Sequence, residues 1–143
     1  MVYLADVTCV GVLVADAIAK PVRSIPDKGK LNLVEHLELH TGGCATNAAI
    51  DLQKIGVSAS IIGKIGRDGF GDFLYNNLKN TGVDVQGLKI QEGLNTSASV
   101  VLVGDDGERT FVHCLGANAE FCEEDVNFDI ISKSEILFVA GAL

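Results

Sequence analysis

The chain is short of basic residues. Its 11 lysines and arginines stand against 19 aspartates and glutamates, so its 143 residues carry a formal net charge of −8 at pH 7. Nucleic acids and anionic membranes are bound through basic patches, and this balance argues against both as partners. No apolar run is long enough to span a bilayer, and the N-terminus lacks a basic region followed by a signal-type apolar core. We therefore expect a cytoplasmic protein.

Cysteine motifs are missing as well. The four cysteines, Cys9, Cys44, Cys114 and Cys122, form no Cys-x-x-Cys pair and have no histidine at the spacing of a metal ligand. This excludes the common zinc and dithiol motifs, and we expect buried structural cysteines. Prolines number only two against sixteen glycines, which indicates many tight connections between strands and helices.

Hydrophobic residues make up 48% of the chain and charged residues 21%, as in an ordinary globular domain. Apolar strand-like segments alternate with helical ones, which predicts an α/β domain with a mostly parallel sheet flanked by helices. We expect strands at 2–13, 59–65, 83–90 and 136–139. We also expect a helix that is capped by Thr41 or Gly42 and runs to about Ile55, a second helix at 69–80 and a short one after Phe121. No helix follows the last strand, so we expect the N-terminal part of one longer domain.

Two extended segments, 16–23 and 33–40, follow the first strand and are separated by a turn-rich connector. They predict a small antiparallel sheet, a lid inserted into the domain. A separate hairpin is expected around Asp105-Asp106-Gly107. With Gly107 in the left-handed conformation, its register puts Ser99 opposite His113. If that face points into a cleft, both side chains could contact hydroxyls; otherwise His113 packs against its neighbour.

The main candidate site is Gly42-Gly43, which runs into a helix and is followed by Asn47 in its first turns. The glycines allow backbone N–H groups to approach a ligand, and the start of a helix carries partial positive charge. Asp16 follows the first strand, and an ionised carboxylate can accept hydrogen bonds from two neighbouring hydroxyls. Ligands of open α/β sheets bind beyond the C-terminal ends of the strands. Together these residues predict a site for a polyhydroxylated molecule.

The segment Gly66-Arg67-Asp68-Gly69-Phe70-Gly71 also joins a strand to a helix. Its spacing is not that of the dinucleotide-binding fingerprint, and the Gly-Lys pairs of the chain match no phosphate-binding loop. This argues against a dinucleotide-dependent oxidoreductase. We interpret the segment as a tight turn in which Asp68 caps the helix, with Phe70, Phe73, Leu74 and Leu78 buried.

These elements resemble the ribokinase (PfkB) family of carbohydrate kinases along essentially the entire chain. The resemblance rests on Asp16, on Gly42-Gly43-Cys44-Ala45-Thr46-Asn47, on the Gly66–Gly71 loop and on Gly116-Ala117-Asn118. It implies a ribokinase-like, Rossmann-like α/β fold with a β lid that often contributes to a homodimer. It also implies ATP- and Mg²⁺-dependent phosphorylation of a sugar or nucleoside hydroxyl, with Asp16, Gly42, Gly43 and Asn47 holding the substrate.

The chain departs from the family pattern at the catalytic base. The family's Gly-Ala-Gly-Asp element lies in the C-terminal half with most of the ATP site, and nothing in this sequence matches it. We therefore expect no catalytic residue within these 143 residues, and no phosphoryl transfer by this chain alone.

The sequence leaves the substrate open. Little basic character near the glycines argues against a phosphosugar, few aromatic residues argue against a nucleoside, and a neutral sugar fits better. The alternatives are a nucleoside kinase and a non-catalytic sugar-binding or interaction protein derived from a kinase. A reading frame that stops at Leu143, instead of continuing into a glycine-rich loop with an aspartate, would favour the non-catalytic protein.

Overall fold

Two four-stranded sheets organise the chain, of which the computed structural model describes residues 5–141. The core sheet has the strand order β5-β4-β1-β8, and all its neighbouring strands are parallel. Its strands are β1 (Ala5–Gly11), β4 (Ala59–Gly66), β5 (Asp84–Gln91) and β8 (Ser134–Ala140). The expected parallel α/β sheet is confirmed, and residues 2–4 of its first expected strand lie outside the described residues.

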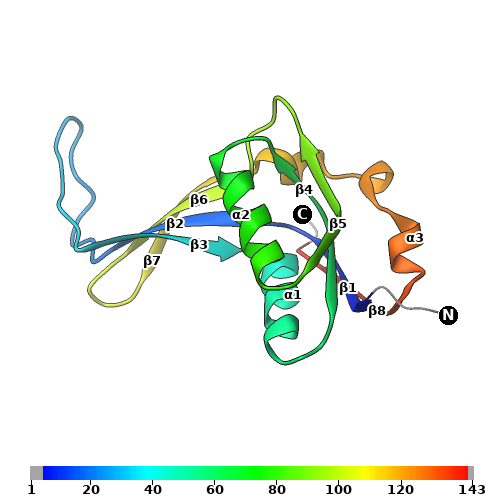
Figure 1. Ribbon diagram of the computed structural model, residues 1–143. Helices are drawn as coiled ribbons and strands as arrows, with labels where there is room; N and C mark the ends of the chain where they lie inside the picture. Colours follow the sequence, from blue (N-terminus) through cyan, green and yellow to red (C-terminus); the bar gives the residue numbers. More distant parts are fainter. Residues whose placement is uncertain (1–4, 142–143) are drawn as a thin grey trace.

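Helices cover both faces of the core sheet, which explains why its inner strands β1 and β4 are mostly buried. On one face, α1 (Cys44–Lys54) and α2 (Gly69–Asn80) lie side by side (Figure 1). They bury a cluster that includes Cys9, Ile50, Ile61, Leu74 and Leu78. On the other face, the short helix α3 (Phe128–Ile131) contributes to a smaller cluster of Val10, Ile62 and Ile130. The short helices η1 (Gly116–Glu120) and η2 (Glu123–Asp125) precede α3.

The second sheet projects from the core like an arm (Figure 1), and we call it the lid. Its strand order is β3-β2-β6-β7, formed by β2 (Val14–Lys20), β3 (His36–Gly42), β6 (Ala98–Val103) and β7 (Arg109–Cys114). Strands β2 and β6 are parallel, and the other neighbours are antiparallel. The lid is larger than the two segments expected from the sequence, because the hairpin β6-β7 pairs with β2 in the same sheet.

The strand register divides the lid into two faces. One row crosses all four strands and consists of His40, Asp16, Ser99 and His113. Neighbours in such a row share a face of the sheet, and we call this side the inner face. The next row consists of Leu39, Ala17, Val100 and Val112. Its side chains belong to the opposite side, the outer face.

Several segment boundaries differ from those expected. Residues 33–35 precede β3 instead of belonging to it, and the N-cap of α1 is Gly43 instead of Thr41 or Gly42. The apolar strand β8 lies at the sheet edge, where its residues 136–139 are 40–62% exposed. By contrast, α2 begins and ends at the residues that its apolar spacing predicted.

Two burial predictions are wrong. Phe70 is 40% exposed, because the buried positions of α2 are those of Gly71, Leu74 and Leu78 and Phe70 is not among them. Cys9 is buried, and burial raises its pKa to about 11, as expected of a structural cysteine. The other three, Cys44, Cys114 and Cys122, are exposed, because one starts α1 on its solvent side and two lie outside the core clusters.

Candidate functional site

The inner face of the lid meets the core where Gly42 and Gly43 join β3 to α1. Asp16 is half-buried on β2, and its carboxylate lies against the backbone of Gly42. A Cβ added to Gly42 would collide with Oδ2 of Asp16. The structure thus brings Asp16 and Gly42 together, and it gives a spatial reason for glycine at that position.

Gly43 has a different requirement. Its φ of +88° is a conformation that side chains disfavour, and a Cβ there would collide with the carbonyl oxygen of Val12. Gly43 is the N-cap of α1, and within residues 5–141 no side chain caps this helix. The first backbone N–H groups of α1 therefore have no side-chain acceptor among the described residues, and the helix dipole adds partial positive charge there.

Asn47 lies in the first turns of α1, where its backbone N–H donates to the carbonyl of Gly43 at 3.0 Å. Its side chain is exposed. The structure thus places Asn47 one turn beyond the glycine pair, with its amide group on the solvent side of the helix.

Ser99 and His113 face each other across β6 and β7, as the hairpin register predicted. The Ser99 hydroxyl and Nδ1 of His113 are 3.0 Å apart. Ser99 is buried, whereas His113 is exposed. The turn has the expected form, because Gly107 has a φ of +84° and the Gly104 N–H donates to the Glu108 carbonyl at 2.9 Å. Both side chains lie on the inner face, with Ser99 next to Asp16 and His113 one strand further away.

A charged cluster at the edge of the lid was missed in the sequence. Oε2 of Glu38 lies 2.7 Å from Nε2 of His40 and accepts from Nζ of Lys20 at 3.2 Å. These hydrogen bonds, first that with His40 and then that from Lys20, lower the pKa of Glu38 below its ordinary value. Alternation along β3 was the available signal, because it puts residues 36, 38 and 40 on one face.

The loop between β4 and α2 connects the core to the lid. Asp68 caps α2 by accepting from the Gly71 N–H at 2.8 Å, as predicted, and its second oxygen accepts from the Thr96 N–H at 2.8 Å. Burial alone would raise the pKa of Asp68, but the hydrogen bonds from Thr96 and Gly71 lower it overall. The carboxylate thus fixes the segment that enters β6.

Asn118 was also not identified as a functional residue from the sequence. It is buried; its Nδ2 donates to the Leu13 carbonyl at 2.8 Å, and its Oδ1 accepts from the Leu13 N–H at 3.3 Å. It thereby fixes the backbone where the chain leaves the core sheet for the lid. The only signal was its place in the Gly116-Ala117-Asn118 segment. A hollow of about 340 Å³ lies beside it, lined also by residues 10–12 and 139–141 at the ends of β1 and β8.

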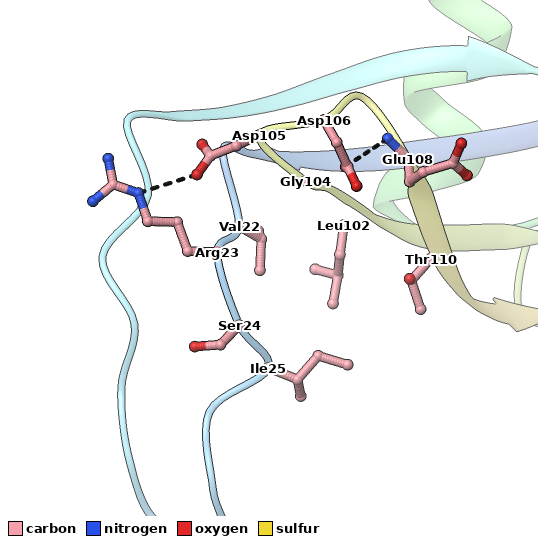
Figure 2. A pocket seen from close by; sticks show the side chains of 10 residues that line it. All are labelled: Val22, Arg23, Ser24, Ile25, Leu102, Gly104, Asp105, Asp106, Glu108 and Thr110. Atoms are coloured by element: carbon pink, nitrogen blue, oxygen red, sulfur yellow. Dashed lines mark hydrogen bonds and ion pairs between the residues drawn. The ribbon is translucent and has the colours of Figure 1, made fainter.

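Another hollow, of about 400 Å³, lies at the far end of the lid (Figure 2). Leu102 and Thr110 line it from the hairpin, and both belong to the outer face. Arg23 closes part of its rim through an ion pair of 3.3 Å with Asp105. This hollow is therefore on the side of the lid opposite to Asp16, and we do not assign it to the same site.

The described residues provide no cluster of three or more histidine, cysteine, aspartate or glutamate side chains arranged to hold a metal ion. Among residues 5–141 there is likewise no helix with the length and hydropathy needed to cross a membrane. The chemistry that the site itself offers is hydrogen bonding: a carboxylate, backbone amides, a hydroxyl and imidazole groups.

Comparison with known proteins gives a consistent result. Residues 4–143 match the model of the pfkB family carbohydrate kinases. The probable fructokinase-6, chloroplastic, of Arabidopsis thaliana is 34% identical over 97 residues, which are 66% of this chain and 25% of that protein. The matched residues therefore span about a quarter of the length of this relative.

Solved structures share the fold. The crystal structure of fructokinase with bound ATP from Xylella fastidiosa has a TM-score of 0.77 and 25% identity, covering 95% of this chain and 42% of that one. The Arabidopsis thaliana ribokinase complexed with ribose and ATP has a TM-score of 0.83 and 20% identity, covering 97% of this chain and 45% of that one. The expected ribokinase-like fold is thus confirmed over less than half of each solved chain.

Proposed function

Because the chain belongs to the pfkB family of carbohydrate kinases, we propose that it forms the sugar-holding part of an enzyme that phosphorylates a sugar hydroxyl with ATP. The observation that carries this proposal is the contact between Asp16 and Gly42 at the start of α1. This contact brings a carboxylate, which can accept from hydroxyl groups, close to a helix N-terminus that no side chain of residues 5–141 caps.

The residues have complementary roles in this proposal. The Asp16 carboxylate accepts hydrogen bonds from two neighbouring sugar hydroxyls, and backbone N–H groups after Gly43 donate to sugar oxygens. Asn47 can do both, since an amide has a donor and an acceptor. Ser99 and His113 contact the sugar from the lid. Closure of the lid excludes water, which would otherwise compete with the sugar for the phosphoryl group.

A neutral, unphosphorylated sugar is the proposed substrate. On the inner face, Nζ of Lys20 donates to Glu38, and His40 is hydrogen-bonded to the same carboxylate, so neither side chain is well placed to bind a phosphate. The fructokinase names of the relatives put fructose first, and the ribose complex of the ribokinase puts ribose second. A cytoplasmic location stays a prediction from the sequence.

ATP and Mg²⁺ are proposed to bind mainly through residues outside this chain. The family's solved relatives include complexes with ATP and Mg²⁺. The described residues of this chain offer neither a cluster of metal ligands nor a glycine loop followed by the lysine and hydroxyl of a phosphate-binding loop.

The test compares the complete product of the reading frame with the 143-residue chain. We expect the complete protein to convert fructose or ribose to a sugar phosphate with ATP, and the 143-residue chain to form none. Product is measured by mass spectrometry, with the unphosphorylated sugar and the ATP-free reaction as controls. Sugar phosphate formed by the 143-residue chain, or none formed by the complete protein with any pentose, hexose or nucleoside, contradicts the proposal.

We also propose that two chains associate through the outer face of the lid. Apolar side chains gather there without cover in the monomer: Leu37 is 74% exposed, Val112 66% and Val100 46%. Isolated exposed apolar residues are common, but several on one flat sheet face are typical of an interaction surface. The family resemblance, in which lids often pair, makes a second copy the proposed occupant.

Charged substitutions on this face are expected to prevent the dimer. We expect the double variant Leu37→Glu and Val112→Glu to sediment as a monomer, because like charges would be buried against each other. Analytical ultracentrifugation at several concentrations measures the effect, with Phe128→Glu, an exposed apolar residue of α3, as the matched control. A monomeric wild-type protein, or a dimer unaffected by the double variant, rules out this interface.

A further inference from the structure

The hydrogen-bonded pair of Ser99 and His113 bears on which atoms of a substrate the lid can bind. It lies on the inner face in the same row as Asp16, with Ser99 between Asp16 and His113. Adjacent strands are about 4.8 Å apart, so the two outer residues of this trio are separated by roughly 10 Å at their backbones. Side chains from both ends can therefore reach one small ligand between them.

Ser99 has few partners for its hydroxyl. Only 6% of this residue is exposed, so water reaches it poorly. Buried hydroxyls are nearly always hydrogen-bonded, and the group in contact with this one is Nδ1 of His113 at 3.0 Å. The other neighbour in the row, Asp16, has its Oδ2 turned toward Gly42 on the opposite strand. The contact allows two directions, and donation from Ser99 to Nδ1 is the one that gives the serine proton an acceptor among the described residues.

This direction determines what the imidazole presents. A neutral histidine has one nitrogen that donates and one that accepts. If Nδ1 accepts the Ser99 proton, the hydrogen of the ring is on Nε2, and the exposed end of His113 is a donor. The row then presents an acceptor at Asp16 and a donor at His113.

We propose that His113 is a specificity-determining residue that donates from Nε2 to a substrate oxygen, and that Ser99 is a positioning residue that fixes its ring and tautomer. This inference rests on the proposed function. The substrate class is a neutral sugar. Hydroxyl groups at one end of this sugar donate to Asp16, and an oxygen at its other end accepts from His113. The position that contacts His113 can therefore be an atom that accepts a hydrogen bond without donating one, such as a ring oxygen or a fluorine that replaces a hydroxyl.

The first test needs no substrate. Long-range nitrogen–proton NMR spectra of the ligand-free protein at neutral pH distinguish the two histidine tautomers. We expect the Nε2–H form for His113, and more ring mobility or a mixture of forms in Ser99→Ala. A predominant Nδ1–H form in the wild type overturns the inference, whatever the enzyme phosphorylates.

The second test uses fructose kinetics of the complete enzyme. We expect KM for fructose to rise roughly fivefold in Ser99→Ala and five- to tenfold in His113→Leu, the loss of one hydrogen bond, with kcat and the KM for ATP nearly unchanged. His36→Leu, a histidine at the far end of the same face, is the matched control. Equal sugar KM in all four proteins overturns the inference while leaving the proposed function intact.

Modified sugars sharpen this result. At one position of fructose, replacement of the hydroxyl by fluorine should weaken binding less than replacement by hydrogen, since fluorine keeps an acceptor but cannot donate. This difference should vanish in His113→Leu. If no fluorine-substituted fructose binds the wild type more tightly than the matching deoxy sugar, His113 does not donate to the sugar.

Discussion

Replacement of Asp16 by alanine is expected to raise the KM for sugar of the complete enzyme about a hundredfold or more, with the KM for ATP nearly unchanged. Hydrogen bonds to a charged group contribute about 1.5–3 kcal/mol each, and two hydroxyls share this carboxylate in the proposed complex. A loss of about 3 kcal/mol corresponds to roughly a hundredfold in affinity. Steady-state kinetics with fructose, and sugar binding measured by calorimetry, give the two values.

A second variant separates the position of the carboxylate from its presence. Gly42→Ala keeps Asp16 but puts a Cβ where its Oδ2 lies. We expect this variant to lose sugar affinity as well, because the carboxylate must turn away. The control is Asp105→Ala, which removes an exposed carboxylate at the far end of the lid and should leave sugar affinity unchanged. Unchanged sugar affinity in Asp16→Ala would remove this residue from the site.

Replacement of Asp125 by asparagine is expected to lower the free energy of unfolding by about 3 kcal/mol. Asp125 is buried and lies 2.6 Å from Nζ of Lys64, which is also buried on β4. Removing one partner leaves the other charge uncompensated in the interior, a change that typically costs 3–5 kcal/mol. We expect the lower end, because Lys64 keeps its hydrogen bond to the Glu120 carbonyl.

Urea denaturation monitored by circular dichroism measures this loss. The double variant Lys64→Met and Asp125→Leu should recover much of it, because neither charge is then left unpaired. Asp51→Asn, which breaks the exposed pair with Lys54 on α1, should cost less than 1 kcal/mol. An Asp125→Asn protein as stable as the wild type would show that the buried pair contributes nothing.

The same pair predicts a pH dependence. Burial alone would raise the pKa of Asp125, but the hydrogen bonds from Lys64 and Cys122 lower it below its ordinary value of 3.8. The carboxylate is therefore more acidic in the folded than in the unfolded protein, and it stabilises the fold above pH 3.8. This contribution is lost as the pH falls through the folded pKa. The stability difference between wild type and Asp125→Asn should accordingly be constant near neutral pH and shrink below pH 4.

The candidate site was predictable only in part. Asp16, Gly42 and Gly43 were identified because Asp16 follows the first strand and the glycine pair starts the first helix, and ligands of α/β folds bind at that edge of the sheet. Their contact was not evident, since it depends on β2 and β3 pairing across a connection of fifteen residues. Asn118 and the Glu38 cluster were missed because a polar residue carries no local sign of its distant partner.

Some exposures could not be predicted either. The run Ile136–Val139 reads like a central strand, yet the structure places it at the edge of the core sheet. Apolar composition shows that a segment has something to pack against. It does not show whether the packing partner lies within these residues.

Local signals determined the order of strands and helices, the limits of α2 and the turn at Gly107, because helical spacing, capping and left-handed glycines act over a few residues. Tertiary structure alone decided that the hairpin joins the lid beside β2, that the Asp16 carboxylate occupies the space above Gly42, and that Lys64 meets Asp125. Each of these links residues far apart in the chain. Their free energy depends on how all the surrounding elements pack, and no short stretch of sequence encodes that.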